Sequence, residues 1–274
     1  MKQTQINRYK VKQDIKTAEN DIVVVEEPLQ IDLCQDDFRE TYSITMRTPG
    51  DDQYLTYGLL FSEGIIDEAK NIDSMTGSVV DEVVTANLIK VEVAPTYKLH
   101  LENKSRRLAS YSGCGICGKT SLQALSLKNP RKPRNLHFNL SCYDIKKARQ
   151  ILAKQTLFSD TGGAHVAGIV YEVFKNDEFH FDFDSAHCFE DVGRHNALDK
   201  LIGYELTNNN LSHSAIVILS GRVGFELVQK VVMAGFSTIV ALGAPSDLAI
   251  KTANQFSLTL IGFAKDEQYN IYTF

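Results

Sequence analysis

The chain has 274 residues, of which 43% are hydrophobic and 23% charged, a composition typical of a soluble globular protein with ample core. Its net charge of −5 argues against a nucleic-acid partner, because general nucleic-acid binders are usually basic. No apolar run approaches the roughly 20 residues that span a bilayer, and the first residues carry no apolar signal-peptide core. We therefore expect a cytoplasmic protein with no membrane partner.

Residues 1–105 are predicted to form a small α+β domain. Apolar and polar residues alternate on either side of a polar break, which predicts two paired strands at 22–25 and 42–46. A helix signal then begins at Pro49–Asp52 and ends near Gly64. Further short strands are predicted at 79–80, 88–93 and 97–101.

Residues 106–141 differ from both flanks and are expected to form a mobile, exposed loop and a basic linker. They contain Cys114 and Cys117, three residues apart among glycines that let other groups approach the backbone closely. Such a pair is typical of half a zinc site, of a redox pair, or of a sulfur-handling nucleophile with its helper. Lys119 and a predicted helix start follow, and both favour a thiolate, which indicates chemistry rather than packing.

Residues 142–274 are predicted to form an α/β domain. Ser141 and Asp144 make a capping box for its first helix, and a hairpin follows around Lys175–Glu178. The rest alternates helix and strand, which is typical of a sheet with right-handed parallel crossovers. The predicted elements are a helix that stops at Gly203, strand 215–219, helix 222–234, strand 238–242, helix 246–256 and strand 257–263.

Two segments follow predicted strands where such a sheet binds its ligands, at the carboxyl ends of the strands. They are Ser220-Gly221-Arg222 and the turn that begins at Gly243. Glycine lets backbone N–H groups approach a ligand, and Arg222 suits a phosphate. An ordinary strand-to-helix turn explains either segment alone. Together, at one edge of the sheet, they indicate an anionic, nucleotide-like ligand.

A second polar cluster, Glu190–Asn196, marks another predicted helix start. A helix cap accounts for Glu190 and Asp191 but not for Arg194 and His195 beside them. A structural and a ligand-binding interpretation therefore both stay open, with Arg194 and His195 as the ligand-binding candidates. His165 is expected to be a structural residue, and Cys188 is able to face the site. Cys34 and Cys142 are expected to be small core or surface residues.

Together these segments resemble the formate dehydrogenase accessory sulfurtransferase family of the FdhD/NarQ type. Several unrelated motifs in one order are more specific than a single Cys-x-x-Cys pair, and the resemblance covers nearly the whole chain. The matching segments are Met46–Asp52, Ser112–Lys119, Thr161–His165, Glu190–Lys200, Ser220–Arg222 with Glu226, Val228 and Lys230, and Gly243–Pro245 through Thr259–Phe263.

The resemblance implies a sulfurtransferase that takes persulfide sulfur from a cysteine desulfurase. It passes this sulfur to a bis-molybdopterin guanine dinucleotide molybdenum (or tungsten) cofactor, which formate dehydrogenase requires. Carried onto this chain, Cys114 is the persulfide carrier and Cys117 its catalytic partner, with no catalytic metal of the protein's own. The residues implied to bind the cofactor are Ser220, Gly221, Arg222, Gly243, Arg194, His195, Phe263, Ala264, Lys265, Asp266, Glu267 and Gln268.

The tail Phe263–Gln268 departs from the basic, proline- and glycine-containing segment that the family carries there. The family's second domain is similar to the cytidine deaminase fold, so we expect a three-layer α/β/α domain with a mixed sheet. The resemblance also implies a homodimer.

Three alternative functions make different demands on the sequence. A zinc deaminase needs H-x-E and P-C-x-x-C at two helix starts, which here carry Arg194-His195-Asn196 and Ser220-Gly221-Arg222, so it is rejected. A non-enzymatic cofactor chaperone would use its cysteines to bind a partner or zinc, with Cys188 and His195 completing four ligands. A thiol–disulfide oxidoreductase lacks the βαβ pattern around its cysteine pair.

Overall fold

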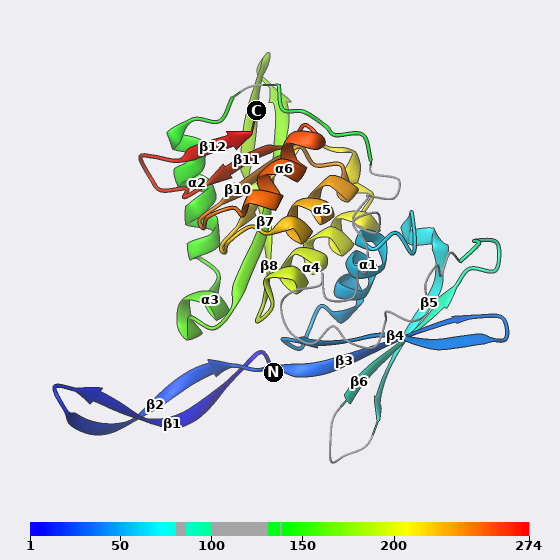
Figure 1. Ribbon diagram of the computed structural model, residues 1–274, viewed down its shortest axis with the longest axis horizontal. Helices are drawn as coiled ribbons and strands as arrows, with labels where there is room; N and C mark the ends of the chain where they lie inside the picture. The colour runs from blue at the N-terminus through cyan, green and yellow to red at the C-terminus, as the bar shows by residue number, and fades with distance from the viewer. Residues whose placement is uncertain (81–85, 100–130, 138, 274) are drawn as a thin grey trace.

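The computed structural model describes residues 1–80, 86–99, 131–137 and 139–273. Its strands form three sheets: the pair β1-β2, a four-stranded sheet in the order β4-β3-β6-β5, and a six-stranded sheet in the order β12-β11-β10-β9-β7-β8. Figure 1 shows helices packed against both larger sheets, while the two-stranded pair projects away from the body. The predicted mixed α/β class is confirmed.

The projecting pair is an antiparallel hairpin of β1 (Gln3–Lys12) and β2 (Ile15–Val24). Its turn residues, Gln13 and Asp14, both have positive φ, as a two-residue hairpin turn of the primed type requires. The predicted pairing of 22–25 with 42–46 is therefore wrong. Residues 22–24 pair with the start of β1, because the tight turn at 13–14 folds the chain back before it reaches the body.

The four-stranded sheet carries α1 (Asp52–Ser62) on one face. Its strands are β3 (Glu27–Gln35), β4 (Phe38–Arg47), β5 (Ile72–Val80) and β6 (Ala86–Val93). The predicted helix is confirmed, and the polar break seen in the sequence is the turn at Asp36 between β3 and β4. Residues 97–99 of the strand predicted at 97–101 are irregular and follow a turn at 95–96, because the side-chain amide of Gln35, not a neighbouring strand, donates to the carbonyl of Tyr97 (2.7 Å). Residues 100–101 lie outside the described residues.

The six-stranded sheet contains the parallel run β9 (Ala215–Leu219), β10 (Thr238–Ala241) and β11 (Thr259–Gly262). Antiparallel strands flank this run on both sides. These are β7 (His165–Lys175), β8 (Glu178–Asp191) and β12 (Asn270–Thr273). The helices are α2 (Cys142–Ala153), α3 (Thr156–Thr161), α4 (Arg194–Thr207), α5 (Phe225–Ala234) and α6 (Asp247–Gln255). Sequence reasoning missed α3 and β12, which are only six and four residues long.

Alternation along β9 explains the layering. Ile216 and Ile218 pack with Ile145 of α2 on one face of the sheet, whereas Val217 packs with residues of α4, α5 and α6, such as Leu201, on the other. This gives the predicted order of helix, mixed sheet and helix. Within the described ranges, no helix is both long and apolar enough to cross a membrane.

Helices α1 and α4 cross at unusually close range. A Cβ added to Gly58 of α1 would lie 1.9 Å from the carbonyl oxygen of Asp199, and one added to Gly203 of α4 would lie 1.9 Å from that of Tyr54. The predicted helix stop at Gly203 is therefore wrong: α4 continues to Thr207, since the glycine provides space for α1 instead of ending the helix. One continuous core joins both sheets across this crossing. The domain division at residues 105 and 142 stays a prediction.

Candidate functional site

Three of the predicted binding segments meet at one edge of the six-stranded sheet, because β9, β10 and β11 are parallel neighbours. The amide of Gly243 donates to the carbonyl of Gly221 (3.2 Å), and the amide of Phe263 donates to the carbonyl of Gly243 (3.1 Å). A Cβ on Gly243 would lie 2.7 Å from the Gly221 oxygen, so this close stack of turns requires glycine. We call this edge the strand-end site.

Strand β7 runs antiparallel to β9, which brings its beginning to the same edge. The Val166 amide donates to the hydroxyl of Ser220 (2.9 Å), and the Ser220 amide donates to the carbonyl of Val166 (3.0 Å). The ring of His165 lies beside Gly221, where an added Cβ would be 3.1 Å from its Nδ1 atom. The sequence interpretation gave His165 a structural role. Only the antiparallel register shows that it borders the strand-end site.

The first turn of α4 supplies the predicted cationic groups. The Arg194 side chain lies near Gly221, with its Cδ atom 4.0 Å from the position of an added Cβ. His195 Nε2 lies 3.1 Å from a carboxylate oxygen of Glu226 on α5, and both side chains are largely buried. Burial lowers the pKa of His165, and the charges of Arg194 and His195 lower it further. Arg194 supplies the positive charge that an anionic ligand would require, whereas Asp191 and Glu226 add negative charge nearby.

Arg222 lies in the connection before α5, not at the start of that helix as predicted. Helix α5 begins at Phe225 instead of 222, because Val223 forms a β-bridge with Pro245 and keeps the connection extended. Arg222 is exposed, and it forms no ion pair with any residue in the part of the chain that the structure describes. Its backbone lies beside Gly243 at the strand-end site, and its side chain is open to solvent.

The rest of the polar cluster around residue 190 has structural roles. The fully buried Asp191 carboxylate accepts from the amides of Thr48 (3.1 Å) and Gly193 (2.8 Å), and lies 2.7 Å from Nζ of Lys200. Asn196 donates to the carbonyl of Met46 (2.7 Å). Glu190 accepts from the amide of Phe158 (2.7 Å) at the start of α3. These contacts join β4, α3 and α4, and they account for three of the five polar side chains of the cluster.

The tail Phe263–Gln268, which follows β11, also contains both residues at the sheet edge and residues with structural contacts. Phe263, with φ of 52°, and the buried Ala264 follow the strand directly, and Ala264 donates to the carbonyl of Ala241 (3.1 Å). The amide of Lys265 donates to the carbonyl of Gln268 (2.8 Å), closing a turn. Asp266 pairs with Arg149 of α2, and the Glu267 carbonyl accepts from the thiol of Cys142. The turn 265–268 is therefore attached to α2, while Phe263 and Ala264 belong to the sheet edge.

The cysteine pair, Cys114 and Cys117, lies outside the described residues. Cys188, the proposed additional zinc ligand, packs on the α2 side of the sheet beside Gly168 and Ile218. Burial raises the pKa of its thiol to about 12, with a contribution from Glu190, so a thiolate is disfavoured there. Among the described residues, no group of three or more His, Cys, Asp or Glu side chains could hold a metal ion.

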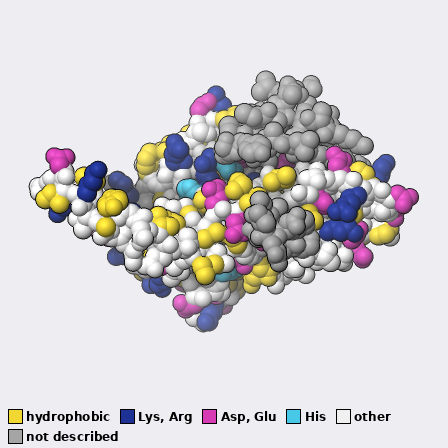
Figure 2. Space-filling view, turned by 90° about the horizontal axis from the view of Figure 1, so that it is seen from below, with side chains coloured by type: hydrophobic (Ala, Val, Ile, Leu, Met, Phe, Trp, Pro, Cys, Tyr) yellow, Lys and Arg dark blue, Asp and Glu magenta, His cyan; other side chains and the backbone are white. Residues whose placement is uncertain are grey.

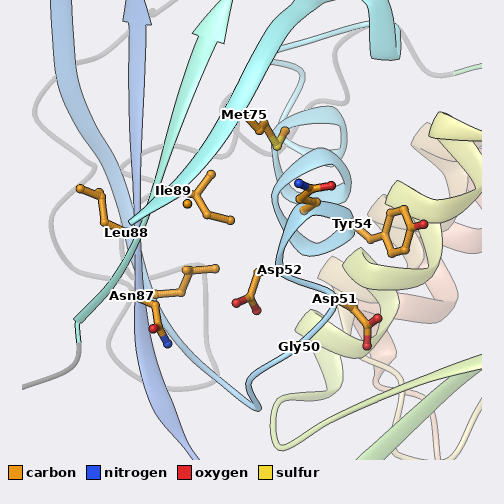
Figure 3. Close-up of a pocket in the computed structure, with 11 residues that line it drawn as sticks. Gly50, Asp51, Asp52, Tyr54, Met75, Asn87, Leu88 and Ile89 are labelled. Atoms are coloured by element: carbon orange, nitrogen blue, oxygen red, sulfur yellow. The ribbon is translucent and has the colours of Figure 1, made fainter. Parts of the chain in front are cut away.

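A cavity of about 460 Å³ lies between the start of α1 and the four-stranded sheet (Figure 3). The Gly50-Asp51-Asp52 end of the Met46–Asp52 motif forms one wall, and Met75 and Ile89 form part of the other. Asp52 points toward the sheet and is held by the buried Arg47 through two hydrogen bonds of 2.9 and 3.0 Å. None of the predicted site residues lines this cavity.

Known proteins resemble this chain along most of its length. A model described as the FdhD/NarQ family matches residues 24–274. A sulfur carrier protein FdhD from Sulfurisphaera tokodaii is 34% identical over 276 residues, covering 100% of this chain and 98% of that protein. One from Streptomyces avermitilis is 39% identical over 261 residues, covering 92% and 87%.

A solved structure shares the fold. It is the crystal structure of a protein assigned as a formate dehydrogenase accessory protein from Desulfotalea psychrophila, with a TM-score of 0.73 and 21% identity. The superposition covers 100% of this chain and 98% of that one. This chain belongs to the FdhD/NarQ family.

Proposed function

We propose that this protein is a cytoplasmic sulfurtransferase that serves formate dehydrogenase. It accepts persulfide sulfur from a cysteine desulfurase and transfers it to the bis-molybdopterin guanine dinucleotide cofactor of molybdenum or tungsten. The observation that carries the proposal is the strand-end site, where Ser220–Arg222, Gly243 and Phe263 meet beside Arg194 and His195. Relatives that are named sulfur carrier proteins support the sulfur-transfer half.

The strand-end site suits the phosphates of a guanine nucleotide. Arg222 is exposed and able to bind phosphate through two parallel N–H groups, while Arg194 adds a second guanidinium beside Gly221. The glycines at 221 and 243 keep the backbone free of side chains, so phosphate oxygens can approach it closely. Phe263 is exposed at the end of the neighbouring strand and offers an apolar surface to a base or pterin ring.

Sulfur transfer onto the protein is assigned to Cys114. Its thiolate attacks the terminal sulfur of the desulfurase persulfide and forms a new S–S bond. The S–S bond of the donor breaks, and the desulfurase cysteine leaves as a thiolate, so the sulfane sulfur changes carrier without net oxidation. Cys117 either assists this step or releases the sulfur by forming a disulfide with Cys114. The cofactor bound at the strand-end site is the acceptor.

The experiment that tests the sulfur step uses mass spectrometry. The full-length protein is incubated with a cysteine desulfurase and cysteine labelled with heavy sulfur, and its peptides are then weighed. We expect one labelled sulfur on the Cys114 peptide, removable by reductant and absent from Cys114→Ala. Cys117→Ala should still acquire the label if Cys117 only assists.

A negative result has a definite meaning. If the parent protein stays unlabelled beside a desulfurase that labels another acceptor, the carrier function is wrong. Nucleotide binding with unlabelled thiols would then favour the cofactor chaperone, because the strand-end site does not depend on the cysteines.

A further inference from the structure

The imidazole ring of His165 lies on the turn after β9, one of the turns that form the strand-end site. A Cβ added to Gly221 would lie 3.1 Å from Nδ1 and 3.3 Å from Cε1 of this ring, and 4.0 Å from Cδ of Arg194. The glycine therefore leaves space for the ring, and an imidazole and an arginine side chain border one small volume. A ligand group in this volume would contact both side chains.

His165 lacks the carboxylate partner that other histidines of the fold have. Three histidine–glutamate pairs are present: His137 with Glu172 (2.6 Å), His187 with Glu205 (2.5 Å) and His195 with Glu226 (3.1 Å). Within residues 1–80, 86–99, 131–137 and 139–273, His165 forms no such pair, although its side chain is only partly exposed. Its ring can therefore gain a counter-ion from a ligand.

Charged groups from three neighbouring elements surround His165. Helix α4 contributes Arg194 and His195, and β8 contributes Asp191, which lies opposite His165 in the strand register. The connection after β9 carries Arg222, whose side chain is open to solvent. Burial lowers the pKa of His165, the charges of the two α4 side chains lower it further, and the Asp191 carboxylate opposes them more weakly. The ring is therefore neutral at pH 7 in the protein without a ligand.

Both nearby carboxylates are engaged elsewhere. Asp191 lies 2.7 Å from Nζ of Lys200 and accepts from the amide of Gly193 (2.8 Å). Glu226 lies 3.1 Å from Nε2 of His195. A negatively charged ligand would thus supply the counter-ion that these side chains do not give to His165.

The charge of the whole molecule does not attract an anion. The chain has a net charge of −5, and Figure 2 shows acidic and basic side chains interspersed on the face that it displays. Because salt screens exposed charges more than about 10 Å apart, the groups in direct contact with a ligand determine whether an anion binds. A protonated His165 would be one of these groups.

We propose that His165 is a phosphate-binding residue of the strand-end site, and that it takes up a proton from solvent when a diphosphate ester binds there. The ring becomes an imidazolium ion, and a phosphate oxygen becomes its counter-ion. No covalent bond other than the new N–H bond forms in this step, and no oxidation occurs. The inference rests on the proposed nucleotide ligand and extends it, because the affinity for that ligand becomes dependent on pH.

The direction of this dependence follows from linkage between proton and ligand. The bound phosphate favours the charged ring and raises the pKa of His165 above its value in the free protein. Between these two pKa values, binding takes up a proton, so the affinity falls as the pH rises, by up to about tenfold per pH unit. Below both values the ring is charged in either state, and the dependence on pH disappears.

The test uses the full-length protein and GDP-mannose. Both phosphates of this probe are esterified and carry no proton near neutral pH, unlike a terminal phosphate, whose second pKa is about 6. Isothermal titration calorimetry at pH 6.5 in PIPES and in imidazole, two buffers with different ionisation enthalpies, gives the number of protons taken up. We expect net uptake of up to one proton by the parent protein, and a Kd that rises about threefold to tenfold between pH 6 and 7.5.

Three variants assign the proton. His165→Gln keeps a side chain that forms hydrogen bonds but cannot become charged, so uptake should be lost and the Kd should vary little with pH. His180→Gln makes the same substitution at an exposed position of β8 and should take up the proton like the parent. His195→Gln should also retain uptake, even where the affinity falls, because His195 already has Glu226 as a partner. Thermal unfolding midpoints verify that each variant is folded.

The outcomes separate this inference from the proposed function. Binding of GDP-mannose by the parent without proton uptake would overturn the role of His165 and leave the nucleotide site in place, and this result needs no variant. Uptake that persists in His165→Gln would also overturn it, and its loss in His195→Gln would assign the proton to the other histidine. Failure of the parent to bind either GDP-mannose or GDP would overturn both this inference and the nucleotide half of the proposed function.

Discussion

The inner side of α4 and the strand-end site are both rich in charge, yet they use it in opposite ways. Asp199 and Lys230 are buried and lie 2.7 Å apart, and Lys200 and Asp191 form a second buried pair. At the strand-end site, Arg222 is exposed and forms no ion pair among the described residues. Charges that are fully paired hold the fold together, whereas charges left available to solvent are free to bind a ligand.

This comparison predicts that inner substitutions change stability and that edge substitutions change binding. An inner substitution that weakened ligand binding, or an edge substitution that lowered stability, would contradict this division of roles. The expected effects below run from the largest to the smallest.

Asp199→Ala should have the largest effect. It leaves the Lys230 ammonium buried without its carboxylate, which typically costs about 3–5 kcal/mol of the free energy of unfolding. Urea unfolding of the full-length protein measures this loss. Lys251→Ala is the control, because the exposed pair of Lys251 and Asp247 contributes less than about 0.5 kcal/mol. Similar losses of unfolding free energy in the two variants would show that the buried pair of Asp199 and Lys230 contributes no more to stability than an exposed pair.

Gly203→Ala should destabilise the crossing of α1 and α4. Replacing glycine by alanine inside a helix usually stabilises it by about 1 kcal/mol, but the new methyl would lie 1.9 Å from the Tyr54 carbonyl. We expect a net loss of about 1–3 kcal/mol as the helices separate, measured by the same unfolding experiment. Gly77→Ala, where nothing lies within 4 Å of the added methyl, should stay within about 0.5 kcal/mol of the parent. A stabilised Gly203→Ala protein would contradict the close crossing.

Arg222→Ala should weaken the binding of GDP, used as a probe for the nucleotide end of the cofactor. Loss of hydrogen bonds to a charged group costs about 1.5–3 kcal/mol, which corresponds to a roughly tenfold to hundredfold rise in Kd by calorimetry. The free energy of unfolding should not change. Lys251→Ala removes the same charge elsewhere and should bind GDP like the parent. Parent-like binding by Arg222→Ala would remove Arg222 from the site.

His165→Gln should produce the smallest effect, visible in the pH dependence of stability. Since burial lowers the pKa of folded His165, the unfolded chain takes up the proton first as the pH falls through about 6.5. The folded protein therefore loses stability below that pH, until the folded imidazole is protonated too. Urea midpoints between pH 7.5 and 5 should fall less steeply in His165→Gln. His180→Gln, at an exposed strand position, is the control, and identical slopes for His165→Gln and the parent would exclude the effect.

The regular part of the fold was predictable from local patterns. Apolar runs between glycine turns predicted β9, β10 and β11, and the capping box of Ser141 and Asp144 predicted α2, with reciprocal hydrogen bonds now seen between the two residues. Parallel neighbours necessarily end at one edge. The meeting of Gly221 and Gly243 could therefore be inferred before any contact was known.

The division of the polar cluster was not predictable in this way. Asp191 and Arg194 are three residues apart at one helix start, yet Asp191 is directed to Thr48, 143 residues earlier in the chain. Only that distant partner shows which residue is structural. The same holds for Gly203, whose local pattern indicates a helix end, whereas its packing against Tyr54 requires a glycine inside the helix.

The Gly58 and Gly203 crossing has a consequence for how the protein unfolds. With two backbones in direct contact and Leu55, Leu60, Leu198 and Leu201 sharing one core, neither sheet can separate without exposing the apolar face of the other. We therefore expect calorimetric and van't Hoff enthalpies to agree, as they do for a single cooperative unit. Fragments cut between the two sheets should be insoluble alone and recover only when mixed.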